Sequence, residues 1–117
     1  MADIQMDKSI LTKEVTELHA DICSALADPR RILILYHLAE ETLNVSELAN
    51  EVDISQPAAS RHLKILRERG LVIPVRQGAS VTYRLADHRL IEALDMLRAI
   101  LRDRISYRAS LMKSDRA

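Results

Sequence analysis

The stretch at residues 44–70, NVSELANEVDISQPAASRHLKILRERG, decides the fold because it predicts two helices separated by a three-residue break. Asn44 can cap the first helix, and Glu47 can bond back to it in a variant of the capping box. Ser55 is the expected cap of the second helix, and Gly70 stands where helices commonly end. A short helix, a tight turn and a second helix together predict a helix-turn-helix over residues 44–70.

The segment that follows predicts a β-hairpin, or wing, over about residues 71–85. Two runs of β-forming side chains, the second alternating apolar with polar residues, flank a turn at residues 77–80 that contains a glycine. Pro74 has no N–H to donate, so it restricts the first strand to the edge of a sheet. A hairpin directly after the second helix makes the helix-turn-helix a winged one.

Further helices are expected on both sides of this unit. Apolar residues at steps of three and four predict one over about residues 10–27, and a longer stripe predicts another over about residues 87–112. Between them, Asp28 as N-cap and Pro29 at the first helical position begin a further helix. The predicted fold class is therefore mainly α with a small β-hairpin, a winged helix-turn-helix in the order α-α-α-α-β-β-α.

Length and composition are consistent with one domain over residues 1–117. Aromatic residues make up 3% of the chain, with no Phe or Trp, so the core must consist of Leu, Ile, Val and Ala. No apolar run approaches the ~20 residues of a membrane helix, and the first residues lack the layout of a secretion signal. A single cysteine leaves no internal disulfide. We therefore expect a cytoplasmic protein with no membrane partner.

Charge is strongly segregated along a chain whose formal net charge is zero. Residues 55–84 carry six bases and one acid, whereas residues 1–54 carry four bases and 11 acids. A concentrated basic segment can present a local positive field to a polyanion even when the whole protein is neutral. Double-stranded DNA is the polyanion that a winged helix-turn-helix suggests.

The second helix of the helix-turn-helix has a face suited to the DNA major groove. At 100° per residue, its apolar residues fall on one half, and the other half holds short polar residues followed by long bases. We expect Gln56, Ser60 and Arg61 to reach base edges, and Lys64 and Arg67 to contact phosphates. On the wing, we expect contacts to an adjacent phosphate or to the minor groove. The complete set of candidate DNA-binding residues is Gln56, Pro57, Ser60, Arg61, Lys64, Arg67, Arg76, Gln77, Ser80 and Arg84.

Two motifs carry a resemblance to a known family. The stretches LADPRRILIL (residues 26–35) and SQPAASRHLKILRERGLV (residues 55–72) resemble the arsenical-resistance repressor (ArsR/SmtB) family of winged-helix regulators, and the resemblance covers roughly residues 18–105. It implies a homodimer that binds an operator inverted repeat, represses transcription and releases the DNA when an inducer binds.

The residues themselves also favour a dimer. The apolar stripes of the first and last helices exceed what a domain this small can cover, and exposed apolar surface of that extent usually marks an interface. We expect a homodimer through these two helices, with the recognition helices about one DNA turn apart. The alternative is that both stripes pack within one chain. They consist of Leu11, Val15, Leu18 and Ile22, and of Leu90, Leu94, Leu97 and Leu101.

Neither metal site of the metal-sensing members of that family is expected here. The resemblance implies a Cys-x-Cys in the third helix, where residues 44–48 read Asn-Val-Ser-Glu-Leu. It also implies a histidine-containing site in the last helix, where the matching positions are Asp87, Arg89, Ile100 and Asp103. Arg and Ile do not ligate zinc. We therefore predict no metal at these sites and no cofactor; an atypical metal site using Asp3, Asp7 and a partner histidine stays open.

Cys23 is the remaining candidate for a sensor. It falls close to the stripe of the first helix and therefore near the expected dimer interface. If partly exposed, it could oxidise, take up persulfide or pair with its mate across a two-fold axis. The alternative is that it acts as a small buried hydrophobe. The inducer is therefore unknown, and a non-metal one is preferred.

Two other classes of function were weighed. The sequence has no Gly-rich phosphate loop and no paired nucleophile and base, so we expect no enzyme. A winged helix that recruits protein partners is the stronger alternative. Its exposed helix face would tend to be apolar or mixed, whereas this face is basic, which favours DNA.

Overall fold

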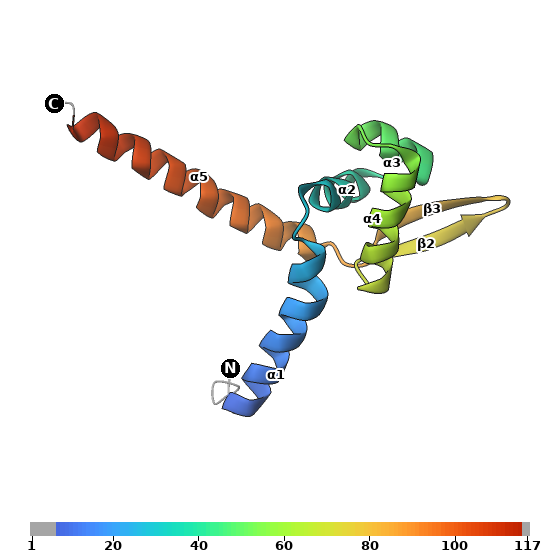
Figure 1. Cartoon of the computed structure of the whole chain (residues 1–117), viewed down its shortest axis with the longest axis horizontal. Coiled ribbons are helices and arrows are strands. Elements are labelled where there is room, and N and C mark those ends of the chain that lie inside the picture. Colours follow the sequence, from blue (N-terminus) through green and yellow to red (C-terminus); the bar gives the residue numbers. More distant parts are fainter. Residues whose placement is uncertain (1–6, 116–117) are drawn as a thin grey trace. The chain divides into compact units, whose positions relative to one another are not determined.

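The computed structural model describes residues 7–115, which fall into two compact parts that meet at Ala86 and Asp87. In the described range, no helix is both long enough and apolar enough to cross a membrane. Figure 1 shows the elements along the chain. The first part comprises α1 (Lys8–Glu17), the π-helix η2 (Leu18–Cys23), α2 (Pro29–Glu40), β1 (Leu43–Asn44), α3 (Val45–Val52), α4 (Gln56–Glu68), β2 (Val72–Gln77) and β3 (Ser80–Leu85), and the second part is α5 (Arg89–Asp115).

Helices α2, α3 and α4 begin where their N-capping residues predict. The Asp28 carboxylate accepts from the backbone N–H of Arg30 at 2.8 Å and begins α2. Asn44 and Glu47 form the complete capping box of α3, with reciprocal bonds of 2.8 and 2.9 Å. The Ser55 hydroxyl accepts from the Ala58 N–H at 3.2 Å and begins α4. These predictions are confirmed.

The sheet has three strands, not the two of the predicted hairpin. β2 and β3 pair antiparallel from Val72↔Leu85 to Gln77↔Ser80, and β1 pairs with the other side of β3. The order β1-β3-β2 leaves β2 at an edge, as Pro74 predicts. β1 was missed because two residues are too few to show a period and form a strand only by pairing with β3.

The first helix differs from the regular helix predicted over residues 10–27. It begins two residues earlier, at Lys8, where Asp7 caps it, and changes to a π-helix at Leu18. A π-helix bonds residue i to i+5, so a stripe at steps of three and four does not predict it. No residue of α1 is buried in the single chain, and Leu11 and Val15 are among its exposed apolar side chains.

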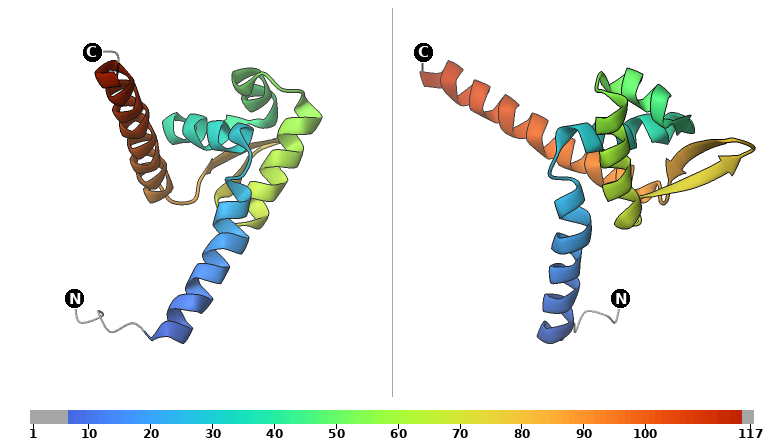
Figure 2. Two further views of the ribbon diagram at one scale, coloured as in Figure 1. Left: turned by 60° about the vertical axis from the view of Figure 1, so that its left-hand side comes forward. Right: turned by 45° about the vertical axis from the view of Figure 1, so that its right-hand side comes forward.

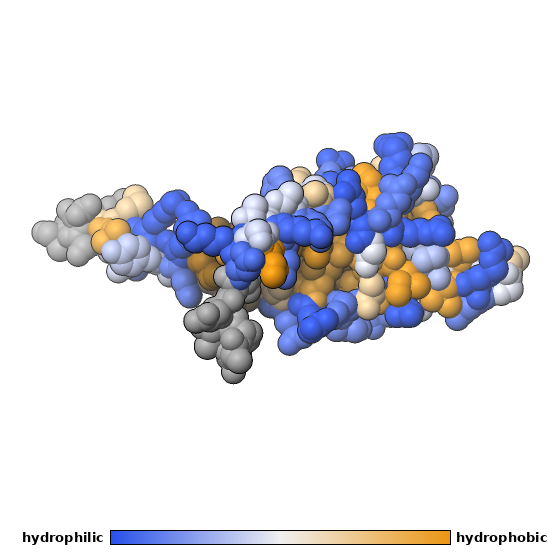
Figure 3. All heavy atoms as spheres, turned by 90° about the horizontal axis from the view of Figure 1, so that it is seen from below, coloured by the Kyte–Doolittle hydropathy of each residue, from blue (hydrophilic) through white to orange (hydrophobic). Residues whose placement is uncertain are grey.

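The core of the first part lies where α2, α3, α4 and the base of the hairpin meet. Its fully buried large side chains are Ile34, Leu35, Leu48, Leu63, Leu66 and Val72. The chain has no Phe or Trp, and the buried hydrophobic residues of the described range are all Leu, Ile, Val or Ala, as composition predicts. Residues 32–36 of α2, Ile-Leu-Ile-Leu-Tyr, are apolar on all sides of the helix, but Leu33 is 48% exposed, so the core does not cover this segment completely. On the face seen in Figure 3, apolar atoms reach the surface between charged side chains.

The second part, α5, is a helix of 27 residues, Arg89–Asp115. The Asp87 carboxylate accepts from the Arg89 N–H at 2.9 Å at its start. Much of its apolar stripe is open to solvent in the single chain, with Leu97 58% and Leu101 53% exposed.

Candidate nucleic-acid interface

Helix α4 separates a buried face from a basic outer face. Ala59, Leu63 and Leu66 are buried against the core, and Ala58, His62 and Ile65 are half-buried at the flanks. The outward residues are all exposed, as the helical period predicts: Gln56, Pro57, Ser60, Arg61, Lys64 and Arg67.

A tight turn holds α4 against α3. Asp53 ends α3 in the left-handed conformation, at φ 58°, which Asp tolerates better than most residues. The Ile54 N–H then donates back to the Ala49 carbonyl at 3.0 Å. These contacts fix the entry of α4, and Figure 2 shows that the C-terminal end of α4 leads directly into the hairpin.

Gln56 has a partner that the sequence did not reveal. Its amide nitrogen donates to the hydroxyl of Ser46 on α3. A bidentate contact to adenine uses both the amide oxygen and the amide nitrogen. Gln56 therefore has to exchange its bond to Ser46 for the base edge if it reads adenine.

Arg69 belongs to the basic segment but not to the outer face. Its guanidinium donates to the carbonyl of Ala20 at 2.7 Å and to the carboxylate of Asp21 at 3.3 Å. Arg69 thus ties the end of α4 to η2, and this explains one of the bases gathered in the segment without reference to a partner.

The wing does not bring its four candidate residues together. Because β2 and β3 pair Arg76 with Val81, Arg76 shares the sheet face of Val81 and Tyr83. Gln77, Ser80 and Arg84 alternate onto the other face. Ser80 donates to the Gln77 carbonyl at 3.1 Å within the turn, and Arg84 donates to the Leu85 carbonyl at 3.3 Å. Only Arg76 therefore lies on the same side of the sheet as the α4 residue Arg67.

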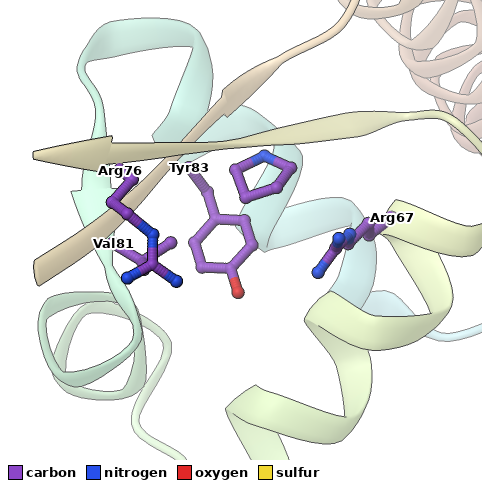
Figure 4. A pocket seen from close by; sticks show the side chains of 5 residues that line it. Arg67, Arg76, Val81 and Tyr83 are labelled. Atoms are coloured by element: carbon purple, nitrogen blue, oxygen red, sulfur yellow. The ribbon is translucent and has the colours of Figure 1, made fainter.

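A hollow of about 340 Å³ lies between α4 and the hairpin. Figure 4 shows the Tyr83 ring between the guanidinium groups of Arg67 and Arg76. Pro74 and Val81 complete the lining. Tyr83 is not among the candidate DNA-binding residues predicted from the sequence. The alternation of side chains along β3 nevertheless places it on the face of Arg76.

Histidine 62 lies on the inner flank of α4 and contacts α2. The Arg31 guanidinium lies 3.3 Å from its Nδ1 and also donates to the carbonyl of Ala25 at 2.6 Å. Because Arg can only donate, Nδ1 must accept, which requires the neutral imidazole. Burial lowers the pKa of His62 below its usual 6.5, although the Asp28 carboxylate acts in the opposite direction. This arrangement supports a structural role for His62.

The candidate sensor residues are dispersed. Cys23 is exposed, not buried as a small hydrophobe. Across residues 7–115 no three His, Cys, Asp or Glu side chains gather as a metal site would require. Asp3, proposed for an atypical site, lies outside the described residues, and Asp7 accepts from the Ser9 N–H at 3.0 Å as the cap of α1.

Two of the four positions that match the family's last-helix metal site, Asp87 and Arg89, are paired with each other. Arg89 donates to Asp87 at 2.7 Å, and hydrogen bonds from Arg89 lower the pKa of that carboxyl to about 2. The carboxylate of Asp87 is therefore occupied by an arginine, which is no metal ligand.

The fold and this face define a class: a winged helix-turn-helix protein with a basic recognition helix. Comparison with known proteins gives the family. Residues 28–73 match the family described as "Bacterial regulatory protein, arsR family". A biofilm growth-associated repressor of Agrobacterium fabrum is 40% identical over 87 residues, which are 72% of this chain and 74% of the repressor. The chain belongs to the arsR family, and the predicted resemblance is confirmed.

Two further relatives extend the comparison. The HTH-type transcriptional repressor SmtB of Mycobacterium tuberculosis is 42% identical over 78 residues, 67% of this chain, and the chain spans only 58% of that repressor. A homodimeric winged helix-turn-helix DNA-binding domain from Mycobacterium bovis, described as a possible ArsR-family regulator, superposes with a TM-score of 0.69 at 27% identity, over 88% of this chain and 93% of the domain. Two of these three relatives are described as repressors and the third as a possible transcriptional regulator, and none of the three is described as an enzyme.

Proposed function

We propose that this chain is a sequence-specific DNA-binding regulator that acts as a dimeric repressor. The observation that carries the proposal is the exposed basic face of α4 beside an arginine-bearing wing, both held by one core. The proposed action on DNA is consistent with the cytoplasmic location that the sequence predicts.

The roles along α4 follow from position. The N-terminal residues Gln56, Pro57, Ser60 and Arg61 enter the major groove, where Arg61 pairs with guanine O6 and N7. Lys64 and Arg67, nearer the C-terminus, contact phosphates and set the register. On the wing, Arg76 lies toward α4, and Gln77, Ser80 and Arg84 serve the opposite face or the tip.

A homodimer completes the operator-binding unit. The exposed stripes of α1 and α5 need a partner surface, and the related domain from M. bovis is homodimeric. A two-fold axis would place two α4 helices about 34 Å apart, matching an inverted repeat.

The inducer that we propose is not a metal at the two usual sites. Asn44 and Ser46 replace the thiolates of one, and Asp87 is paired with Arg89 at the other. Exposed Cys23 is a candidate for oxidation or persulfidation. The test compares DNA affinity before and after peroxide or polysulfide for the wild type and for Cys23→Ser. Loss of affinity in the wild type alone supports a thiol sensor, and equal behaviour of both excludes it.

The first experiment is a fluorescence-anisotropy titration of the reduced, metal-free protein. The targets are DNA from upstream of its own gene and a scrambled control, at two salt concentrations. Tight, selective and salt-sensitive binding supports the proposal, because phosphate neutralisation makes affinity fall steeply with salt. Binding that appears only with added metal points to an atypical metal site. Weak binding under every condition favours the protein-recruiting alternative.

A further inference from the structure

The hollow between α4 and the hairpin is lined by donors and by no acid. Arg67 and Arg76 provide two guanidinium groups, and Tyr83 provides a hydroxyl that lies between them in Figure 4. The guanidinium groups have only N–H donors, and their planar fork matches the oxygens of a phosphate. Pro74 and Val81 form the apolar remainder of the wall. This chemistry selects an anion.

None of these three polar side chains is engaged within the protein. Over residues 7–115 the structure shows no hydrogen bond or ion pair from the side chains of Arg67, Arg76 or Tyr83. Arg69, two residues from Arg67, is by contrast bound to Asp21 and the Ala20 carbonyl. The donors of the hollow are therefore available to a ligand.

The backbone position of Tyr83 is fixed by strands that pair with β3 on both sides. Tyr83 lies on the central strand β3, where it pairs with Pro74 on one side and Leu43 on the other. Tyr83 is half-buried, so part of its side chain packs against the protein. It also lines the hollow, where its hydroxyl can meet a ligand. The short strand β1, which buries Leu43, thus contributes to the position of a binding group.

We infer that this hollow binds one phosphate of the DNA backbone, with Tyr83 as a third donor beside Arg67 and Arg76. The inference rests on the proposed function. Suppose that α4 occupies the major groove and that the wing reaches the neighbouring minor groove. The sugar-phosphate backbone of DNA that separates those two grooves must then pass between α4 and the wing, where the hollow lies. The volume of about 340 Å³ is roughly ten times that of one water molecule, so a phosphate diester fits. Tyr83 fixes the register of the protein on DNA and reads no base.

The first test replaces Tyr83 by Phe, which removes the hydroxyl and keeps the ring. The expected result is operator binding weaker by about three- to tenfold per hollow, the usual size of one lost hydrogen bond, with the base preference and the unfolding midpoint unchanged. Tyr107→Phe is the matched control, because Tyr107 is an exposed tyrosine of α5. Equal binding by Y83F and the wild type overturns the inference.

The second test finds the phosphate. A series of operator duplexes carries one neutral methylphosphonate at a time, and each is titrated with the wild type and with Y83F. At one position per half-site the wild type should lose about tenfold, while Y83F loses clearly less, since one of the three donors to that phosphate is already gone. If the loss from Y83F and the loss from the methylphosphonate multiply independently at every position, the inference is overturned.

A third arm separates the two sources of phosphate. Inorganic phosphate is compared with chloride at equal ionic strength. If phosphate competes specifically while no methylphosphonate position is coupled to Tyr83, the hollow takes a free phosphate and the assignment to DNA is wrong. Failure of the proposed function is seen separately, because the wild type itself would then show no selective, salt-dependent binding.

Discussion

At the scale of single residues, Arg61 is the side chain on which sequence recognition is proposed to depend most. It is exposed on the outer face of α4, one turn after the helix begins. Arg61→Ala should weaken specific binding by about 1–3 kcal/mol and relax the preference at one base position in each half-site, because a bidentate contact to guanine is lost. Titration against operators substituted at each position measures both effects.

Lys64→Ala is the matched control for that prediction. Lys64 is equally exposed and carries the same charge, but its proposed partner is a phosphate. Binding to all sequences should weaken alike, and the slope of log affinity against log salt should flatten by roughly one unit per lost contact. If Arg61→Ala gave this uniform pattern too, Arg61 would be a phosphate contact instead.

His62 is expected to make the fold sensitive to acid. Its folded-state pKa lies below 6.5 because of burial, so in that window the unfolded chain binds more protons than the folded one. The free energy of unfolding should therefore fall as the pH is lowered through about 6.5 and level off below the folded pKa. Protonation also removes the acceptor that faces Arg31.

The pH prediction is checked by the ring-proton chemical shifts of His62 as a function of pH. A midpoint above 6.5 would contradict it, because the neutral ring would then not be favoured by folding. His62→Asn, whose unfolding should lack this share of the pH dependence, separates His62 from the carboxyl groups that titrate in more acidic solution.

The residue scale also shows where the sequence is insufficient. Exposure along α4 follows from helical period alone, and those predictions hold for Pro57, Ser60, Arg61, Lys64 and Arg67. The partners of Gln56 and Arg69 lie 10 and 48 residues earlier in the chain. No local pattern encodes contacts over such separations.

At the scale of elements, the caps determine where the recognition helix begins. Ser55→Ala removes the acceptor for the Ala58 N–H and should lower the free energy of unfolding by about 0.5–2 kcal/mol. DNA affinity should fall as well, because the first turn of α4 carries Gln56 and Pro57. Denaturant unfolding measures the first effect and anisotropy the second.

Ser55→Asp is the control for the cap, since Asp is an equally good N-cap. It should retain the stability that Ser55→Ala loses. Its added negative charge beside DNA should still weaken binding, so the two readouts separate. If Ser55→Ala unfolded like the wild type, the cap would contribute nothing measurable to α4.

Elements with strong local signals were predicted, and those that depend on distant pairing were not. Caps, turn glycines and apolar period gave α2, α3, α4 and the hairpin. The turn lies at the predicted residues: Gln77 pairs with Ser80 across it, and Gly78 has φ 64°. β1 needs β3 beside it, and η2 depends on hydrogen bonds that the side-chain period does not report.

At the scale of the whole molecule, the proposed homodimer depends on the exposed apolar stripe of α5. Leu97 is 58% exposed in the single chain, and in a two-fold dimer each substitution is present twice. Leu97→Glu should therefore shift the protein toward monomer, since it places two symmetry-related charges in one apolar interface. Sedimentation equilibrium measures the shift. Ser106→Glu, which adds the same charge to an exposed position about 180° around the helix from Leu97, should remain dimeric.

Loss of the dimer should also change recognition in a defined way. A monomer presents one α4 to one half-site, so Leu97→Glu should lose most of its preference for an inverted repeat over a single half-site. Its affinity for an isolated half-site should stay close to that of the wild type, because the outer face of α4 lies in the part of the chain before Ala86. If the variant were monomeric and still preferred the inverted repeat, that preference would not depend on the dimer, and the proposed coupling of the two recognition helices through α5 would be wrong. If the variant stayed dimeric, the stripe of α5 would not be needed for the dimer.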